Sequence, residues 1–238
     1  MVLLEGCVQR AATPRTNDAA RRVFDRLGIE LVSARWEGCC GAVNHHLGAH
    51  AAALADMRRN IDALWPHIEA GAEAVISSAT GCGAQIADYG RLLADDPEYC
   101  KRAARISELA LDIAGALGRE PLESLPLTAS RGAIAVHTPC SQSHALGQPD
   151  SVRQLLQRCG YVLTSTREDH LCCGSAGTYS LLQPDTSQRL RSRKLSALTS
   201  EQPTRIVTAN VGCQLHLGSA ADIPVVHWIE CLATDISD

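Results

Sequence analysis

Aromatic residues, an excess of basic charge and long apolar runs are all scarce in this 238-residue sequence. Aromatic residues make up 3% of the chain, so any core must be built from aliphatic side chains. Lysine and arginine number 22 against 26 aspartate and glutamate residues, and this net charge of −4 argues against a nucleic-acid-binding protein. No apolar run approaches the ~20 residues needed to cross a bilayer, so no transmembrane segment is predicted.

The N-terminus also lacks the features of an export signal. It has no basic segment before its short apolar run, and Glu5 interrupts that run. The sequence therefore predicts a cytoplasmic protein, in which thiols are kept reduced and a disulfide scaffold is not expected. Eleven cysteines nevertheless occur, and metal ligation, redox chemistry or packing of small buried residues remain as their explanations.

Eight of the cysteines form an internal repeat. Three positions recur at one constant offset along the chain, and the fourth recurs at an offset that is only slightly shorter. Both copies contain an adjacent pair followed by glycine, so packing by chance is a poor explanation of the pattern. The repeated cysteines are Cys7, Cys39, Cys40 and Cys82 in the first half and Cys140, Cys172, Cys173 and Cys213 in the second half.

The residues between these cysteines predict alternating strands and helices. Short apolar, β-branched runs precede the first and last cysteine of each half, and helical periodicity follows them. This order is typical of an α/β protein with parallel sheets. We predict two repeated parallel-sheet domains, 1–120 and 132–238, related by pseudo-twofold symmetry, with a connector over residues 118–132.

In a parallel α/β sheet, the segments that follow the strands meet at the carboxyl edge. The four cysteines of each half are therefore expected to converge there, although long stretches of chain separate the first from the last. Adjacent cysteines can reach one site only on a turn, which the Cys-Cys-Gly sequence allows. Four thiolates without carboxylates suit a soft metal, so zinc and an iron–sulfur cluster are the candidates.

Three further cysteines fall outside the repeat. Cys159 occupies the position of Leu27 before a glycine, and Cys231 falls where the first half has Leu109. Cys100 has no counterpart. We expect these three residues to pack in the core or on the surface rather than to bind metal.

These patterns resemble the CCG cysteine-rich domain family, in which Cys-Cys-Gly lies between a single cysteine and a Cys-x-x-Cys motif. One of the subunits of heterodisulfide reductase has two such domains, and the C-terminal two-thirds of the glycolate oxidase iron–sulfur subunit is similar to this chain. The resemblance covers nearly all of the sequence. It is carried by residues 4–7, 38–43, 70–74 and 81–84 in the first half and by residues 170–179, 206–217 and 227–230 in the second.

The resemblance implies an electron-transfer subunit of a flavin-dependent glycolate, or other 2-hydroxy-acid, oxidase. It implies 4Fe-4S clusters on the eight repeated cysteines, with no catalytic residue on this chain. The flavin is expected on partner subunits because no Gly-rich dinucleotide fingerprint occurs here. Electrons are expected to pass to a ferredoxin-like module or quinone, and the partners to hold the protein peripherally at the inner membrane.

Two departures from the family pattern keep alternatives open. The ferredoxin-like segment of the glycolate oxidase subunit, with its two further cysteine motifs, is not found in these 238 residues. A truncated form, a split gene and a stand-alone subunit like that of lactate-oxidation systems all stay open. The final Cys-x-x-Cys is replaced, with Gln85 and His216 at the third position after Cys82 and Cys213.

The second departure weakens a five-cysteine cluster of the heterodisulfide reductase kind. An ordinary cubane in each half, zinc in one half, a thiol–disulfide redox subunit and a structural zinc protein remain as alternatives. His216 is a candidate fifth ligand or hydrogen-bond donor, because imidazole also ligates iron. The basic run of residues 189–194 is predicted to be a solvated helix face.

Overall fold

The structure, a computed structural model, describes residues 1–128 and 132–237. It divides into two compact units, Met1–Ala116 (unit 1) and Leu117–Asp238 (unit 2). Residues 129–131, inside the predicted connector, and residue 238 lie outside the described residues. Each unit contains one parallel sheet with helices, which confirms the α/β class and the repeated domain. The domain limits and the pseudo-twofold relation stay predictions.

Unit 1 alternates strands and helices as its sequence predicts. Pro14 begins the helix that carries the apolar 3.6-residue pattern, where its fixed φ and missing N–H cost nothing. The elements are β1 (Val2–Leu4), α1 (Cys7–Ala12), α2 (Pro14–Arg26), β2 (Val32–Ser33), α3 (Ala42–His46), α4 (His50–Glu69), β3 (Val75–Ser77), α5 (Thr80–Ala87), α6 (Tyr89–Leu92), α7 (Cys100–Leu109), β4 (Ala110–Asp112) and α8 (Ile113–Leu117), which reaches the boundary.

Unit 2 repeats this order with shorter connections. Its first helical turn after the first strand is π-helical rather than α-helical. The elements are η1 (Leu122–Ser124), β5 (Ile134–His137), η2 (Ser141–Ala145), α9 (Ser151–Arg158), α10 (Tyr179–Leu182), α11 (Pro184–Thr199), β6 (Arg205–Thr208), α12 (Val211–Gly218), β7 (Val225–His227) and α13 (Trp228–Asp235).

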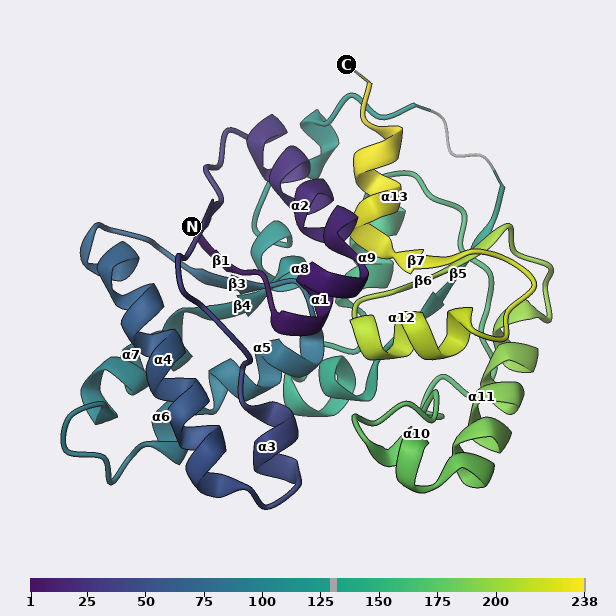
Figure 1. Ribbon diagram of the computed structural model, residues 1–238. Coiled ribbons are helices and arrows are strands. Elements are labelled where there is room, and N and C mark those ends of the chain that lie inside the picture. The colour runs from purple at the N-terminus through teal and green to yellow at the C-terminus, as the bar shows by residue number, and fades with distance from the viewer. Residues whose placement is uncertain (129–131, 238) are drawn as a thin grey trace. The chain divides into compact units, whose positions relative to one another are not determined.

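The two sheets share one strand order. The sheet of unit 1 runs β2-β1-β3-β4, and that of unit 2 runs β5-β6-β7. Figure 1 shows β1, β3 and β4 of the first sheet and β5, β6 and β7 of the second. Leu163 is bridged in parallel to Ile134 on the outer side of β5. In both units, the extended segment that follows the first strand pairs on one side of that strand, and the next strand along the chain pairs on its other side. Open α/β sheets place their sites in the crevice at the carboxyl ends beside such a reversal. The fold therefore provides one candidate site in each unit.

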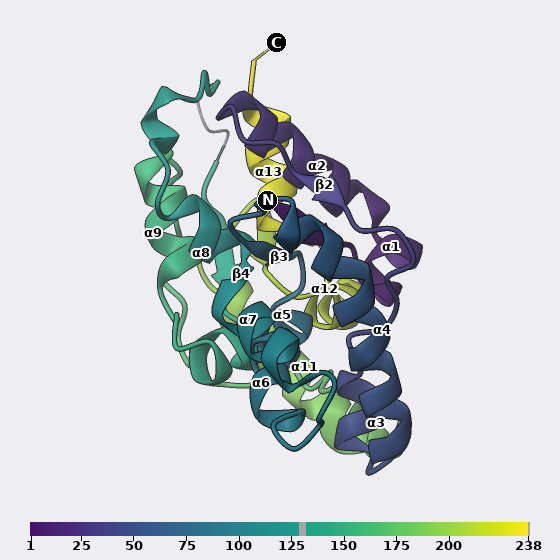
Figure 2. The same cartoon turned by 90° about the vertical axis from the view of Figure 1, so that its left-hand side faces the viewer.

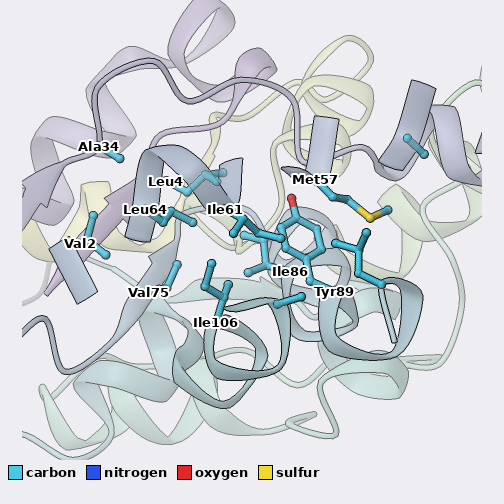
Figure 3. Close-up of a cluster of buried hydrophobic side chains, with 13 residues drawn as sticks. Val2, Leu4, Ala34, Met57, Ile61, Leu64, Val75, Ile86, Tyr89 and Ile106 are labelled. Carbon is cyan, nitrogen blue, oxygen red and sulfur yellow. The ribbon is translucent and has the colours of Figure 1, made fainter. Parts of the chain in front are cut away.

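The core of unit 1 is aliphatic, as the scarcity of aromatics predicts. Figure 3 shows Leu4 of β1 near Ile61 of α4, with the fully buried Tyr89 ring beside Ile86, and Val2 belongs to the same cluster. Helix α5 packs next to β3 and β4, which Figure 2 shows from the side. This packing anchors α5, the helix that carries Cys82.

The core of unit 2 includes two cysteines of the repeat. Cys173 and Cys213 pack in one buried cluster with Ala135, Ile206 and Leu217. Their sulfur atoms therefore lie at the boundary between the aliphatic core and the strand ends. Burial of this kind excludes water from a soft metal site.

The structure corrects the proposed counterpart of Cys231. Strand pairing aligns Ser77 with Asp112 in unit 1 and Thr208 with His227 in unit 2, so β7 corresponds to β4. Counting onward from these pairs, Cys231 matches Ala116 rather than Leu109. Both residues are buried, and the error arose because the connection before β7 is shorter than that before β4.

The structure also corrects the predicted solvated face of residues 189–194. Arg189 and Arg193 are exposed on α11, whereas Lys194 is 0% exposed. Its ammonium group donates hydrogen bonds to the carbonyls of Glu168 (3.1 Å) and Asp169 (3.2 Å). A buried lysine needs such partners because desolvation of an unpaired ammonium is costly.

Candidate metal centres

The four repeated cysteines of unit 1 meet at the carboxyl end of its sheet. Cys7 begins α1 directly after β1, and Cys82 lies in the first turn of α5 after β3. Cys39 and Cys40 occupy the loop between β2 and α3. Their thiols form a connected series, because Cys39 hydrogen-bonds to Cys7 and Cys40, and Cys40 hydrogen-bonds to Cys82. We call this set the first centre.

Unit 2 builds the same set, which we call the second centre. Cys140 lies at the start of η2 after β5, and Cys213 lies in the first turn of α12 after β6. Cys172 and Cys173 occupy the loop before α10. Cys172 hydrogen-bonds to Cys140 and Cys173, and Cys173 hydrogen-bonds to Cys213. The structure thus brings together all four predicted cysteines in each unit.

The Cys-Cys-Gly turn has the same hydrogen bond in both units. The N–H of Gly41 donates to Sγ of Cys39 at 3.4 Å, and the N–H of Gly174 donates to Sγ of Cys172 at 3.3 Å. An N–H aimed at sulfur favours its thiolate form over the thiol. The turn therefore presents one ready thiolate in each set.

Only glycine fits the last position of this turn. Gly41 and Gly174 have φ values of 86° and 90°, in the left-handed region. A Cβ at Gly41 would lie 3.0 Å from the carbonyl oxygen of Ala53, and one at Gly174 would lie 2.5 Å from that of Ser187. Helix α4 therefore packs directly against the turn at Gly41, and α11 packs against the turn at Gly174.

The electrostatics of each set favour cation binding. Hydrogen bonds from Cys40 and then Cys7 lower the pKa of the Cys39 thiol far below its usual range. Hydrogen bonds from Cys140 and Cys173 do the same to the pKa of Cys172. Closely spaced thiols that share protons are poorly satisfied by themselves, whereas a metal ion replaces those protons.

The donor chemistry fits a soft metal or an iron–sulfur cluster. Each centre offers four sulfur atoms, with a peptide N–H donor at the Cys-Cys-Gly turn, and in unit 2 aliphatic core residues pack behind two of those sulfur atoms. Zinc and iron–sulfur clusters both take four thiolates, and the properties of a cluster are tuned by hydrogen bonds to its sulfur atoms.

A buried polar side chain ties each cysteine loop to the following helix. In unit 1, Asn60 accepts from the N–H of Gly38 and donates to the carbonyl of Cys39, both at 2.8 Å. Lys194 of α11 corresponds to Asn60 of α4. The carbonyl oxygen that faces the turn glycine belongs to Ala53 in unit 1 and to Ser187 in unit 2, and Asn60 and Lys194 each lie seven residues after it. The charge of Lys194 also attracts the thiolates of Cys140 and Cys173. The first centre has a neutral amide where the second has a cation.

The residues that replace the last cysteine of the family motif bond to side chains at the rim. Gln85 lies 3.4 Å from Nδ1 of His45, and Nε2 of His216 lies 3.2 Å from Oγ of Ser187. The Ser187 hydroxyl in turn donates to the carbonyl of Gly174. His216 therefore braces the second turn through Ser187, and its ligation of a metal stays a prediction.

Sequence reasoning missed one residue of the second centre. His137, the last residue of β5, is 1% exposed. Its ring and the sulfur atoms of Cys173 and Cys213 form a group whose donor atoms all lie within 4.8 Å of one another. The signal was its place three residues before Cys140, where the first half has Leu4 before Cys7. One histidine within an apolar strand carried no periodicity that could mark it.

The three cysteines outside the repeat lie on other elements. Cys100 begins α7, Cys159 ends α9 as Leu27 ends α2, and Cys231 is buried in α13 near Arg205, 3.7 Å away. Burial raises the pKa of the Cys159 thiol to about 11. Burial also raises the pKa of the Cys231 thiol, and neutral thiols such as those of Cys159 and Cys231 are inert.

A family comparison agrees with this repeated architecture. The model of the cysteine-rich domain family CCG matches residues 1–87 and 134–218. The chain belongs to the CCG cysteine-rich domain family. Each matched segment of this CCG protein contains one complete set of four cysteines.

Relatives of this CCG chain include named subunits of oxidation systems. The chain is 49% identical over 230 residues to the "Glycolate oxidase iron-sulfur subunit" of Escherichia coli (strain K12), covering 97% of this chain and 56% of that one. It is 28% identical over 242 residues to the "Probable glycolate oxidase iron-sulfur subunit" of Bacillus subtilis (strain 168), covering 98% and 54%. The chain thus spans about half the length of these curated relatives.

A third relative has a similar length. The chain is 27% identical over 224 residues to "Lactate utilization protein A" of Bacillus velezensis (strain DSM 23117 / BGSC 10A6 / LMG 26770 / FZB42), covering 90% of both chains. Within residues 1–128 and 132–237, no helix is long and apolar enough to cross a membrane.

Proposed function

We propose that this chain is the iron–sulfur electron-transfer part of a flavin-dependent complex that oxidises glycolate or a similar 2-hydroxy acid. The observation that carries the proposal is the duplicated four-thiol set, in a chain 49% identical to a glycolate oxidase iron–sulfur subunit. We assign Cys7, Cys39, Cys40 and Cys82 as ligands of the first centre. Cys140, Cys172, Cys173 and Cys213 are assigned to the second.

The residues of the chain hold and shield the centres. The thiolates of Cys39 and Cys172 are poised by their N–H donors, while Cys40 and Cys173 place sulfur against the aliphatic interior. An iron–sulfur cluster bound there supplies one-electron transfer. The low polarity behind the sulfur atoms favours retention of the metal because water cannot compete for it from that side.

Removal of hydride from a 2-hydroxy acid needs a different cofactor. That step requires a flavin or nicotinamide beside the substrate carbon, and no Gly-rich dinucleotide fingerprint occurs in this sequence. We therefore place the flavin on partner subunits and assign no catalytic residue to this chain. A quinone or a ferredoxin-like module is the proposed acceptor, with the complex in the cytoplasm or at the inner surface of the membrane.

Metal analysis and reconstitution test the proposal. Protein purified without oxygen should contain iron and acid-labile sulfide, and zinc without sulfide in both centres would contradict it. Glycolate-dependent reduction of an artificial dye should require added flavin subunits and should fall when Cys82→Ser or Cys213→Ser is used. Turnover by this chain alone, free of flavin, would also refute the electron-relay assignment.

A lactate-oxidising complex is the second candidate. The observation that favours it is the 90% coverage in both directions with a lactate utilization protein A. The substrate separates the two readings, because the same reconstituted complex can be assayed with glycolate and with lactate. A preference for lactate would transfer the assignment to that system without changing the role of the cysteines.

A further inference from the structure

The second centre contains an imidazole that the first centre lacks. The two units place different residues at one position, three before the first cysteine and at the end of the first strand. Leu4 pairs in register with Ser77, and His137 pairs in register with Thr208. Both Leu4 and His137 are 1% exposed. The position is thus a core position in unit 1 that carries a polar ring in unit 2.

The imidazole of His137 has no nitrogen or oxygen partner that explains its burial. Neither Nδ1 nor Nε2 is bonded to such a partner within the described residues, and the Thr208 hydroxyl across the sheet has none either. Burying a polar ring without a nitrogen or oxygen partner is costly, because a weak bond to sulfur does not fully replace its lost hydration. The groups that do face the ring are the sulfur atoms of Cys173 and Cys213, and a hydrogen bond links the ring to the Cys213 sulfur.

The spacing of these three residues suits direct metal binding. Their donor atoms all lie within 4.8 Å of one another, and Cys172 hydrogen-bonds to Cys173 as a fourth donor. A single tetrahedral ion, such as the Co²⁺ used in the test below, has metal–sulfur bonds of ~2.3 Å and metal–nitrogen bonds of ~2.0 Å and needs donors roughly 3.5–4 Å apart. The 4.8 Å limit on the three donor atoms lies close to that range.

We propose that His137 is a metal ligand of the second centre, which makes it a mixed thiolate–imidazole site, whereas the first centre is all thiolate. The inference rests on the proposed function only in that unit 2 holds a metal. Because an imidazole ligand is neutral, it gives the second centre a nitrogen donor without the negative charge of a further thiolate. The asymmetry lies in the ligands themselves and not only in their surroundings.

Cobalt titration of the metal-free chain tests this assignment whichever metal the native protein carries. The parent variant is Cys82→Ser, which disables the first centre. Co²⁺ is added without oxygen, the sulfur-to-cobalt charge-transfer band counts thiolates, and the ligand-field bands report nitrogen. Introducing His137→Leu should weaken Co²⁺ binding at least tenfold and move the ligand-field bands to those of an all-sulfur set. Leucine is tolerated at this core position in unit 1, so the variant should fold.

Two further variants complete the test. His137→Asn can donate a hydrogen bond but ligates poorly, so it should behave as His137→Leu does. His144→Gln changes an exposed histidine of η2 and should leave affinity and spectrum unchanged. Parental affinity and bands in either folded His137 variant would overturn the assignment. Iron and sulfide analysis of the native protein is independent, so a lack of iron would overturn the proposed function alone.

Discussion

The two units use the same thiol frame but surround it differently. Both have the Cys-Cys-Gly turn with its N–H···S bond, and in both a helix side chain bonds to the loop that carries the cysteine pair. Unit 1 has Leu4 and Asn60 at two buried positions where unit 2 has His137 and Lys194. The frame is thus a local property of the repeat, whereas charge and ligand type come from positions outside the cysteine motif.

The first unit also places a carboxyl group near its centre. Glu37, two residues before Cys39, is 8% exposed, and both of its oxygens accept from the N–H of Glu5 at 2.9 Å. Burial raises the pKa of Glu37 to about 7. The guanidinium of Arg59 helps to lower the pKa of Cys39, but this guanidinium is half-exposed and paired with Asp56. Unit 1 therefore has no buried cation to match Lys194 among its described residues, and the two centres should differ in potential.

The largest effect is expected when one of the two centres is removed at a time. Cys82→Ser and Cys213→Ser should each lower the iron content to roughly half, because each unit contains a complete set of four thiols. Cys159→Ala is the matched control and should retain all of the metal. Metal analysis after anaerobic desalting measures this. Loss of all iron in one cysteine variant would show that the centres are not independent.

The next effect concerns the turn glycines. Gly174→Ala should destabilise the chain by about 2–5 kcal/mol, since it combines the ~1–2 kcal/mol cost of left-handed backbone with ~1–3 kcal/mol of overpacking against Ser187. Gly41→Ala should cost less, because its Cβ would meet Ala53 at 3.0 Å rather than 2.5 Å.

Urea unfolding measures the difference between the two glycines. Gly160→Ala is the control, since Gly160 has φ 81° but open surroundings and should show only the backbone cost of about 1–2 kcal/mol. Equal destabilisation by all three substitutions would mean that the approach of α11 to its turn contributes nothing.

A smaller effect is expected from the charge of Lys194 on the midpoint potential of the second centre. Lys194→Asn installs the residue of unit 1, and the midpoint potential of the second centre should fall, because a nearby positive charge stabilises the more negative reduced state. An interaction of ~1–2 kcal/mol at an effective dielectric constant of ~20 corresponds to about a tenfold change in the reduced-to-oxidised ratio, or ~59 mV for one electron.

Redox titration followed by EPR spectroscopy measures this shift. Arg193→Asn is the control on the same helix, since the exposed Arg193 pairs with Glu168 at the surface and solvent screens its charge. An unchanged potential in Lys194→Asn, or an equal shift in Arg193→Asn, would remove the electrostatic distinction between the two centres.

The smallest effect tests the corrected counterpart of Cys231. Cys231→Ala copies Ala116 and should cost about 1 kcal/mol, for a small loss of buried volume and of the contact with Arg205. Metal content should not change. Urea unfolding and iron analysis measure both quantities, and loss of iron would place Cys231 at a centre after all.

The sequence alone determined the repeat, the α/β class and the convergence of the eight cysteines. Strand ends, glycine turns and helical periodicity are local features, and parallel sheets bring the segments after their strands to one edge. Cys7 and Cys82, which lie far apart along unit 1, could therefore be assigned to one site from the sequence pattern.

Only the tertiary structure decided what surrounds the thiols. In the sequence, His137 is one of several residues in a strand, and Lys194 is one of several charges on an amphipathic helix. The sheet register places His137 beside Cys173, and the packing of α11 places Lys194 near the same cysteine. The register of β7 was likewise hidden by a connection of different length. Which side chains share a buried face depends on how elements cross in space, and spacing along one sequence does not encode that.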